Sequence, residues 1–298
     1  MINKVKKEKP IISKHKTKML IAIEQIGQET PLDADSVVYM SQGFTTATMP
    51  HRKVEGQIYN RKNGNYQLCM MAFPDQKIPY GVIPRLFIIW LITEIVRTKR
   101  KEIELGSCFS EFLKKLKFDT GGYTGKRVKE QIAWLSSVSV GFLHTNKKVF
   151  ESIKPESIIE HARIWWIDDK NDTQQQLFPS SITVSESFYN EAMKAFPVDM
   201  RIVDALRNSA MKLDIYLWLT LKMYNVKRDM EISYAALKLQ FGADYEDTPK
   251  GLDNFRTKFR TNFKAVLNLY SANVDLTSPQ SILLHKSETS VPKIRNDG

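Results

Sequence analysis

The chain has 298 residues, of which 42% are hydrophobic and 26% are charged, a balance that allows one or two globular domains. Its 44 lysines and arginines outnumber 33 acidic residues and leave a formal net charge of +11, which favours a polyanionic partner, most often nucleic acid, over an inert basic surface. The only two cysteines, Cys69 and Cys108, argue against a disulfide framework, and the most apolar run, residues 86–96, is about half of a membrane span. We expect a cytoplasmic protein that does not enter a membrane.

The N-terminal segment is rich in lysine. Residues 1–18 contain seven lysines and one glutamate, and a block of like charges repels itself, so we expect a basic flexible arm over residues 1–36. Such an arm is either a solvated tail or a segment that contacts DNA. Residues 37–80 alternate short strand-like runs with turns, and Asn63-Gly64 between two of these runs predicts a β-hairpin.

The middle of the chain predicts helices and strands in a definite order. Three helices and one strand come first, at residues 83–99 (helix), 101–106 (strand), 107–118 (helix) and 124–137 (helix). Strand-like runs follow at residues 138–145, 147–153, 161–167 and 181–185. The first two of these runs, joined at Asn146-Lys147, are expected to form a two-stranded ribbon.

The same order begins again near residue 200. A long helix, a strand, two helices and two strands are expected at residues 201–224, 230–233, 234–241, 252–270, 273–276 and 281–285. Helix, short strand, helix, turn, helix and a two-stranded ribbon is the winged helix-turn-helix plan. We therefore predict an α+β fold with two tandem winged helix-turn-helix domains, the first preceded by β-hairpin strands. The predicted segments are the arm 1–36, an N-terminal winged-helix domain 37–195 with added strands, a C-terminal winged-helix domain 196–286 and a tail 287–298.

A glycine cluster, GGYTGKR at residues 121–127, precedes the third helix and raises the question of phosphate binding. A P-loop needs G-x-x-x-x-G-K-[ST] after a strand, so that backbone amides hold phosphates. Here Thr120 stands where the first glycine is needed, Arg127 replaces the Ser/Thr, and the preceding element is a predicted helix. The glycines are therefore assigned to the turn of a helix-turn-helix.

The helix at 252–270 has one apolar and one cationic side. Its apolar stripe consists of Phe255, Phe259, Phe263, Val266 and Tyr270. Residues 254–270 contain no acid, whereas a merely solvated face would intersperse glutamates among the cations. Arg, Asn and Thr can reach base edges in a major groove, while lysines pair with phosphates. The candidate DNA-binding residues here are Asn254, Arg256, Thr257, Lys258, Arg260, Thr261 and Lys264.

The helix at 124–137 repeats this division less clearly. Val128, Ile132 and Leu135 recur at helical spacing and face a core. The candidate DNA-binding residues of its other side are Lys126, Arg127 and Lys129, diluted by Glu130 and Ala133. Lys147 and Lys148 are expected to form a basic wing tip on the DNA backbone.

Two long stretches, residues 47–68 and 79–132, resemble the plasmid-encoded RepA-type replication initiators. The most specific part runs through Tyr80-Gly81, Pro84-Arg85, TEIVRTK at 93–99 and Gly121-Gly122. The resemblance covers roughly residues 44–270 and leaves the arm and the segment after His285 unmatched.

This resemblance implies a protein that binds repeated duplex DNA sites in a plasmid origin, helps to open the duplex and recruits the host initiator and replicative helicase. It also implies that homodimers, which repress their own promoter, exist beside monomers. A winged-helix transcriptional repressor (autorepressor) without a replication role needs the same helices and stays an alternative.

No catalytic or metal-binding pattern is recognised in the sequence. None of the five histidines has the one-residue spacing that nicking initiators use to hold a metal, and no cysteine pair has zinc spacing. Asp168, Asp169 and Asp172 lack EF-hand spacing and indicate a solvated loop. Trp165-Trp166 could stack unpaired bases, although packing in a core is favoured. We expect no enzyme activity, no cofactor and no metal; a metal-dependent nicking enzyme is the alternative from another class.

Overall fold

The computed structural model describes residues 14–32, 36–119, 121–145, 150–152, 156–164 and 180–292. The elements up to residue 199 are α1 (Lys14–Gln28), β1 (Val37–Met40), α2 (Gln42–Thr46), β2 (Ile58–Asn63), β3 (Tyr66–Ala72), α3 (Val82–Thr98), β4 (Glu102–Gly106), α4 (Phe109–Lys115), α5 (Gly122–Ser137), β5 (Val138–Thr145), β6 (Phe150–Ser152), β7 (Glu156–Ser157), β8 (Ile159–Arg163), β9 (Ser180–Val184), α6 (Glu186–Ala192) and β10 (Phe196–Asp199). The elements that follow are α7 (Met200–Leu206), α8 (Ala210–Asn225), β11 (Met230–Ser233), α9 (Tyr234–Phe241), α10 (Pro249–Leu267), β12 (Val274–Asp275) and β13 (Ser281–Leu284).

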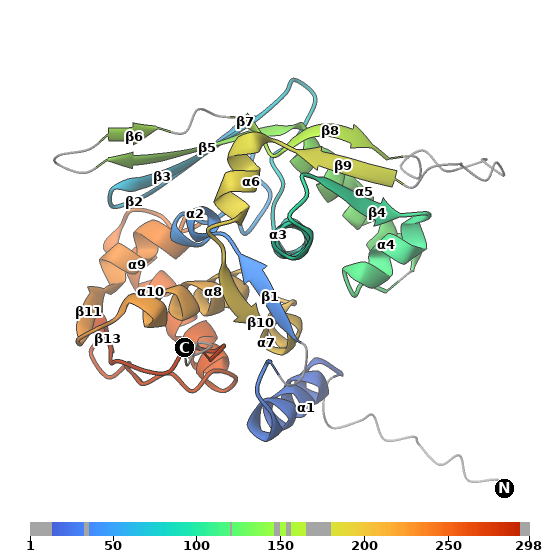
Figure 1. Cartoon of the computed structure of the whole chain (residues 1–298). Helices are drawn as coiled ribbons and strands as arrows, with labels where there is room; N and C mark the ends of the chain where they lie inside the picture. The colour runs from blue at the N-terminus through green and yellow to red at the C-terminus, as the bar shows by residue number, and fades with distance from the viewer. Residues whose placement is uncertain are drawn as a thin grey trace, which may run out of the picture.

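Helix α3 lies at the centre of the molecule (Figure 1). The sheet of β2, β3, β5 and β6 lies above it, the group of α4, α5, β4, β8 and β9 lies to one side, and α8, α9 and α10 lie below and to the other side. Most of α3 is buried because its sequence is apolar on nearly every side, which is typical of a helix surrounded by other elements. The mixed α+β fold class is confirmed.

The predicted hairpin is present in the upper sheet. Strands β2 and β3 pair antiparallel from Ile58↔Met71 to Asn63↔Tyr66, so that Gly64 and Asn65 form a two-residue turn. Gly64 has a φ of 57°, in the left-handed region that glycine adopts at no steric cost. Strand β3 also pairs with β5, which extends the sheet to the order β2-β3-β5-β6 with β7 beside β5.

Two three-stranded sheets share one topology. Their strand orders are β4-β9-β8 and β11-β13-β12, so in each sheet the first strand in the chain pairs antiparallel with the third, which pairs with the second. Two helices lie between the first and second strands of each set, namely α4 and α5 in one and α9 and α10 in the other. The repeated order of elements that the sequence predicts is therefore present, with β5, β6 and β7 inserted into the first copy.

The ribbon of the first copy differs from the prediction. Strands β5 and β6 do pair, but they belong to the sheet of β3, and the ribbon beside β4 is β8–β9. An alternating pattern identifies a strand and its inward side chains, but it does not identify the partner strand. The proposed wing-tip residues Lys147 and Lys148 lie outside the described residues, as do Trp165, Trp166 and the acidic loop at 168–176.

The expected long helix after residue 199 is broken into α7 and α8. The break falls at residues 207–209, where the Ser209 side chain accepts a hydrogen bond from the backbone N–H of Lys212 and caps α8. A helix-period pattern continues across this break, which explains why the sequence alone predicted one helix.

Both ends of the chain contain structure that the sequence did not predict. The flexible arm expected over 1–36 is wrong for its second half, because α1 packs against α7 and Arg201 donates to the carbonyl oxygens of Gln25 and Glu29. Near the other end, Val291 is buried. The predicted domain boundaries stay a prediction, and β1 pairs with β10 across the boundary between 195 and 196.

Candidate nucleic-acid interface

Helix α10 is anchored by an aromatic stripe. Phe255, Phe259 and Phe263 are fully buried, and the Phe259 ring centroid lies 5.3 Å from that of Phe255 and 5.5 Å from that of Phe263. The helix begins with Thr248 as its N-cap, which accepts a hydrogen bond from the Gly251 N–H at 3.0 Å, and with Pro249 in the first turn. The opposite side of α10 is therefore turned away from the core.

The outward side of α10 carries the candidate DNA-binding residues. Five of them are exposed, namely Asn254, Thr257, Lys258, Thr261 and Lys264. Arg256 and Arg260 are half-buried at the border of this side. No acidic residue occurs in α10 after Asp253. The structure thus brings all seven predicted residues onto one helix with none of them sealed in the core.

The two arginines of α10 also have structural partners. Arg256 Nη1 donates to the carbonyl oxygen of Pro279 at 2.9 Å, and Arg260 Nη1 donates to that of Ser278 at 3.3 Å. Arg256 further pairs with Asp253. These bonds tie α10 to the turn between β12 and β13, so the helix and its ribbon present one continuous surface.

The glycine cluster at the start of α5 is explained by the close packing of α5 against α4. A Cβ at Gly125 would lie 3.1 Å from Cε1 of Phe109, so glycine lets α4 and α5 approach closely. The Gly125 N–H donates to the Gly121 carbonyl oxygen at 2.9 Å and is not available to a phosphate. Val128, Ile132 and Leu135 are buried as predicted. The cluster therefore packs two helices together and does not form a phosphate loop.

The outward side of α5 is cationic and aromatic. Lys126 and Arg127 are exposed, and the Arg127 guanidinium lies 5.9 Å from the ring centroid of Tyr123, which is 78% exposed. Lys129 is half-buried, with its Nζ 4.8 Å from the ring centroid of Phe109. Only Lys126 and Arg127 of the three α5 candidates are fully available to a partner.

The sequences of α5 and α10 can be aligned with an offset of 131 residues. In this alignment four equivalent positions are buried in both helices: Val128 and Phe259, Gln131 and Asn262, Ile132 and Phe263, and Leu135 and Val266. Gln131 and Asn262 are buried polar side chains at equivalent positions, which sequence reasoning missed because an amide interrupts an apolar stripe without an evident signal. Gln131 Oε1 accepts from the Tyr80 N–H at 2.9 Å, and Asn262 Nδ2 donates to Met211 Sδ at 3.0 Å.

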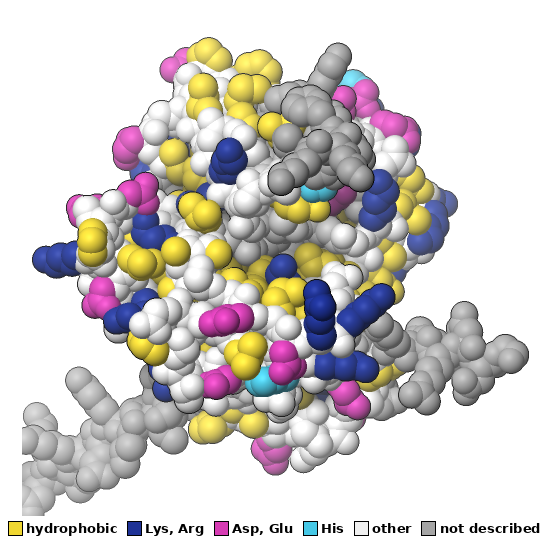
Figure 2. Space-filling model, turned by 90° about the vertical axis from the view of Figure 1, so that its left-hand side faces the viewer, with side chains coloured by type: hydrophobic (Ala, Val, Ile, Leu, Met, Phe, Trp, Pro, Cys, Tyr) yellow, Lys and Arg dark blue, Asp and Glu magenta, His cyan; other side chains and the backbone are white. Residues whose placement is uncertain are grey.

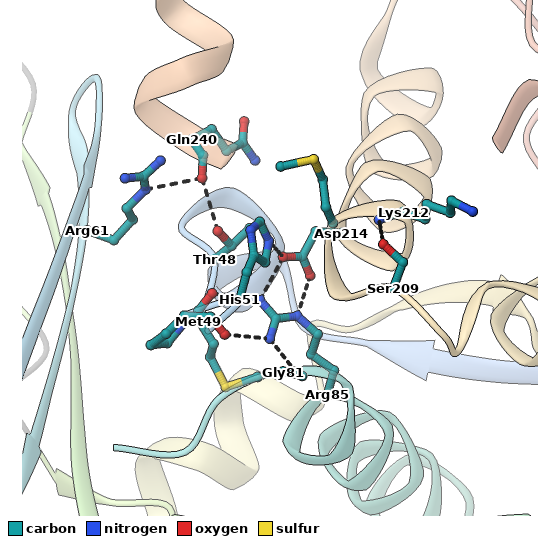
Figure 3. A network of polar contacts seen from close by, with 12 residues as sticks. Thr48, Met49, His51, Arg61, Gly81, Arg85, Ser209, Lys212, Asp214 and Gln240 are labelled. Atoms are coloured by element: carbon teal, nitrogen blue, oxygen red, sulfur yellow. Dashed lines mark hydrogen bonds and ion pairs between the residues drawn. The ribbon is translucent and has the colours of Figure 1, made fainter. Parts of the chain in front are cut away.

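A buried ion pair lies between the two halves of the chain (Figure 3). Arg85 of α3 and Asp214 of α8 form a bidentate pair, with both N···O distances at 2.7 Å, and His51 Nε2 lies 2.7 Å from Asp214 Oδ2. Burial alone would raise the pKa of Asp214, but the Arg85 charge and hydrogen bonds from His51 and Arg85 hold that pKa below its ordinary value. From the sequence, Arg85 is noted only within the family resemblance and His51 only as a loop histidine with a partner, and Asp214 is not identified.

The surface is not uniformly basic. Figure 2, which views the left-hand side of Figure 1, shows Lys and Arg side chains gathered on the lower half of that face with acidic side chains beside them. In the part of the chain that the structure describes, no group of three His, Cys, Asp or Glu residues could hold a metal. Within the same residues, no helix combines the length and apolarity that crossing a bilayer requires.

The comparisons with known proteins agree with this architecture. A crystal structure of RctB domains 2–3 matches with a TM-score of 0.52 and 10% identity, covering 82% of this chain and 97% of that one. A second crystal structure, of selenomethionine derivatives of RctB domains 2 and 3, matches with a TM-score of 0.54 and 10% identity, covering 86% and 97%. At such identity these matches show a shared fold. Among curated proteins, none matches the chain significantly.

The family follows from the sequence match. Residues 78–236, more than half of the chain, match the family described as plasmid-encoded RepA protein. The protein therefore belongs to the plasmid-encoded RepA family, and the resemblance noted in the sequence is confirmed.

Proposed function

We propose that this protein is a plasmid replication initiator that binds repeated duplex DNA sites at an origin through two winged-helix modules. In this proposal α5 and α10 are the recognition helices, and β8–β9 and β12–β13 are the ribbons of the two wings. Origin opening, recruitment of the host initiator and replicative helicase, and a homodimeric form that represses the promoter belong to the same proposal. Membership of the RepA family supports it.

The outward side of α10 is the observation that carries the proposal. It places amide, hydroxyl and cationic side chains on one helix whose other side is fixed in the core. An α-helix of this kind fits the major groove of B-DNA, where arginine and asparagine read base edges and lysines contact phosphates. The ties from Arg256 and Arg260 to the β12–β13 turn support a helix and wing that dock together.

A salt titration tests the DNA-binding part. Binding of labelled origin DNA is measured by fluorescence anisotropy between 50 and 200 mM salt, where six to ten phosphate contacts would lower the affinity by about three to five decades. The double substitution Lys258→Ala and Lys264→Ala is expected to reduce both affinity and salt slope, while Lys194→Ala, an exposed lysine after α6, leaves them unchanged. A flat salt response in the unaltered protein contradicts the proposal.

A replication assay separates an initiator from a repressor. The gene is placed with its flanking repeats on a replicon that lacks its own origin, and autonomous replication is scored in the host. Replication that is lost in the Lys258→Ala and Lys264→Ala variant supports the initiator. DNA binding without replication supports the autorepressor, and relaxation of supercoiled origin DNA with magnesium would indicate a nicking enzyme.

A further inference from the structure

We propose that Arg85, Asp214 and His51, together with Arg61 of β2, form a positioning clamp that holds α5 and α10 at one separation, so that the protein reads two blocks of a DNA site as a rigid body. The inference rests on the proposed function and adds to it how the two modules are kept in register. These four residues are positioning residues, because none of them lies on the proposed DNA-contacting sides of α5 and α10.

The clamp uses every hydrogen-bond donor of a buried guanidinium. Besides the two bonds to Asp214, Arg85 Nη1 donates to the carbonyl oxygens of Pro50 at 3.1 Å and Gly81 at 2.6 Å, and Nη2 donates to that of Met49 at 2.6 Å. Arg85 is 1% exposed and Asp214 is 5% exposed. A planar, fully bonded fork permits one relative placement of α3, α8 and the loop before β2.

The clamp is connected to both proposed recognition helices through their equivalent amides. On one side, Gly81 accepts from Arg85, and the neighbouring Tyr80 N–H donates to Gln131 of α5. On the other side, Asp214 lies one turn along α8 from Met211, whose sulfur accepts from Asn262 of α10. A continuous path of polar contacts and one helical turn therefore runs from the inner side of α5 to the inner side of α10.

A second set of contacts holds the helix that precedes α10. Arg61 of β2 donates through Nε to the Gln240 carbonyl oxygen at 3.2 Å and through Nη2 to that of Lys238 at 2.8 Å. Thr48 Oγ1 donates to the same Gln240 oxygen at 3.0 Å, and Gln240 Nε2 donates to the Thr45 carbonyl oxygen at 2.8 Å. The donors of Arg61 and Thr48 satisfy carbonyl groups in the last turn of α9, where a cation also suits the helix dipole. The first half of the chain thus fixes the second module at two places.

The chemistry of the clamp favours positioning over stabilisation. Two charges buried together lose their hydration, and apolar residues of similar volume are often as stable or more stable. A bidentate ion pair adds two parallel, directional hydrogen bonds, and a shift of one helix along the other would break them. Rigid spacing matters on DNA because two inserted base pairs turn one block by about 70° relative to the other, given 10–10.5 base pairs per turn.

The test combines a spacing series with a measurement that needs no DNA. The first variant is the double substitution Arg85→Gln and Asp214→Asn, which keeps hydrogen-bonding groups and removes both charges together. The second is Arg61→Met, which leaves the ion pair intact and serves if the first variant does not fold. The matched control is Arg97→Met, because Arg97 also donates to a backbone carbonyl, that of Val37, but lies outside the path between α5 and α10.

In the spacing series, footprinting first identifies the two blocks of one origin repeat that the protein protects. We expect one or two base pairs inserted between the blocks to weaken binding of the unaltered protein and of Arg97→Met by at least about tenfold, because one module then loses its base contacts. The clamp variants are expected to bind the original repeat more weakly and to lose less than about threefold on insertion. Equal insertion penalties in the unaltered protein and both clamp variants would overturn the clamp.

The second measurement is the distance between spin labels at Glu130→Cys in α5 and Thr261→Cys in α10, two exposed positions that are equivalent in the two helices. Cys69→Ala and Cys108→Ser remove the native thiols. We expect a narrow distance distribution in the otherwise unaltered protein and a broader one in the clamp variants. A broad distribution before any clamp substitution overturns the clamp. A narrow distribution, combined with no binding of origin DNA by the unlabelled protein with its native Thr261, contradicts the proposed function instead.

Discussion

Replacing Phe259 with alanine tests whether the core of the second module holds α10 in place. The ring is fully buried, and its centroid lies within 5.3–6.3 Å of four other aromatic rings, those of Phe255, Phe241, Phe263 and Tyr234. Truncation of a buried phenylalanine costs about 3–5 kcal/mol, through lost transfer free energy and the cavity that remains. The upper part of this range applies here because the lost aromatic pairs each add roughly 0.5–1.5 kcal/mol and the rigid neighbours cannot collapse inward.

Urea unfolding followed by circular dichroism measures this loss. A free energy of unfolding of about 5–15 kcal/mol would fall by a large fraction, which moves the unfolding midpoint well outside experimental error. The matched control is Val128→Ala at the equivalent position of α5, where the smaller side chain should cost less. A change below about 1 kcal/mol for Phe259→Ala would refute the inward placement of the stripe, and with it the outward placement of the cationic side.

The remaining predictions concern packing, DNA affinity and pH. Gly125→Ala should destabilise the protein by about 1–3 kcal/mol, because the added Cβ pushes α4 away from α5. Gly121→Ala should leave the stability unchanged, because a Cβ there meets nothing within 4 Å. Thermal unfolding of both variants measures the difference. Lys264→Ala alone should reduce the slope of log affinity against log salt by about 1 for all sequences alike, and an unchanged slope would remove this residue from the interface. Because the pKa of Asp214 is lowered in the folded state, its stabilisation is present above the unfolded value of about 3.9 and is lost as pH falls through the folded value. Between neutral and acid pH, the free energy of unfolding should therefore fall by more in the unaltered protein than in the Arg85→Gln and Asp214→Asn variant, which has no carboxylate at position 214. An equal fall in both proteins would contradict this.

The sequence predicted those elements whose signals are local. The stripe at Phe255, Phe259 and Phe263 has a helical period, and the Asn63-Gly64 pair marks a turn between two strand-like runs. Helix α10 and the β2–β3 hairpin are therefore found where expected, with the turn itself at Gly64 and Asn65. Pairing between distant strands has no such signal. The pattern of residues 138–145 indicates a strand equally well beside β3 or beside β4, and only the tertiary fold selects β3.

The buried ion pair of Arg85 and Asp214 could not be predicted from the sequence. Arg85 stands in a helix that is apolar on nearly every side, and nothing in its own neighbourhood identifies Asp214, which is 129 positions away in the chain. A buried charge is stable only with a partner, so an arginine inside such a helix is itself a signal that one exists. Identifying the partner requires the fold, because the two helices are brought together only by packing of the two halves.

The paired amides Gln131 and Asn262 occupy equivalent inner positions of two helices whose outward residues differ. Both are buried at the same position, yet Gln131 is bonded to the backbone before α3, while Asn262 is bonded to a side chain of α8. The inner sides of α5 and α10 are thus alike because both pack in a core, and the proposed clamp joins them, whereas packing does not constrain their outer sides. Lys126, Arg127 and Lys129 correspond to Thr257, Lys258 and Arg260 at the offset of 131 residues. Two modules with equivalent cores and different outer residues, held at one spacing, would read two different DNA sequences within one asymmetric repeat.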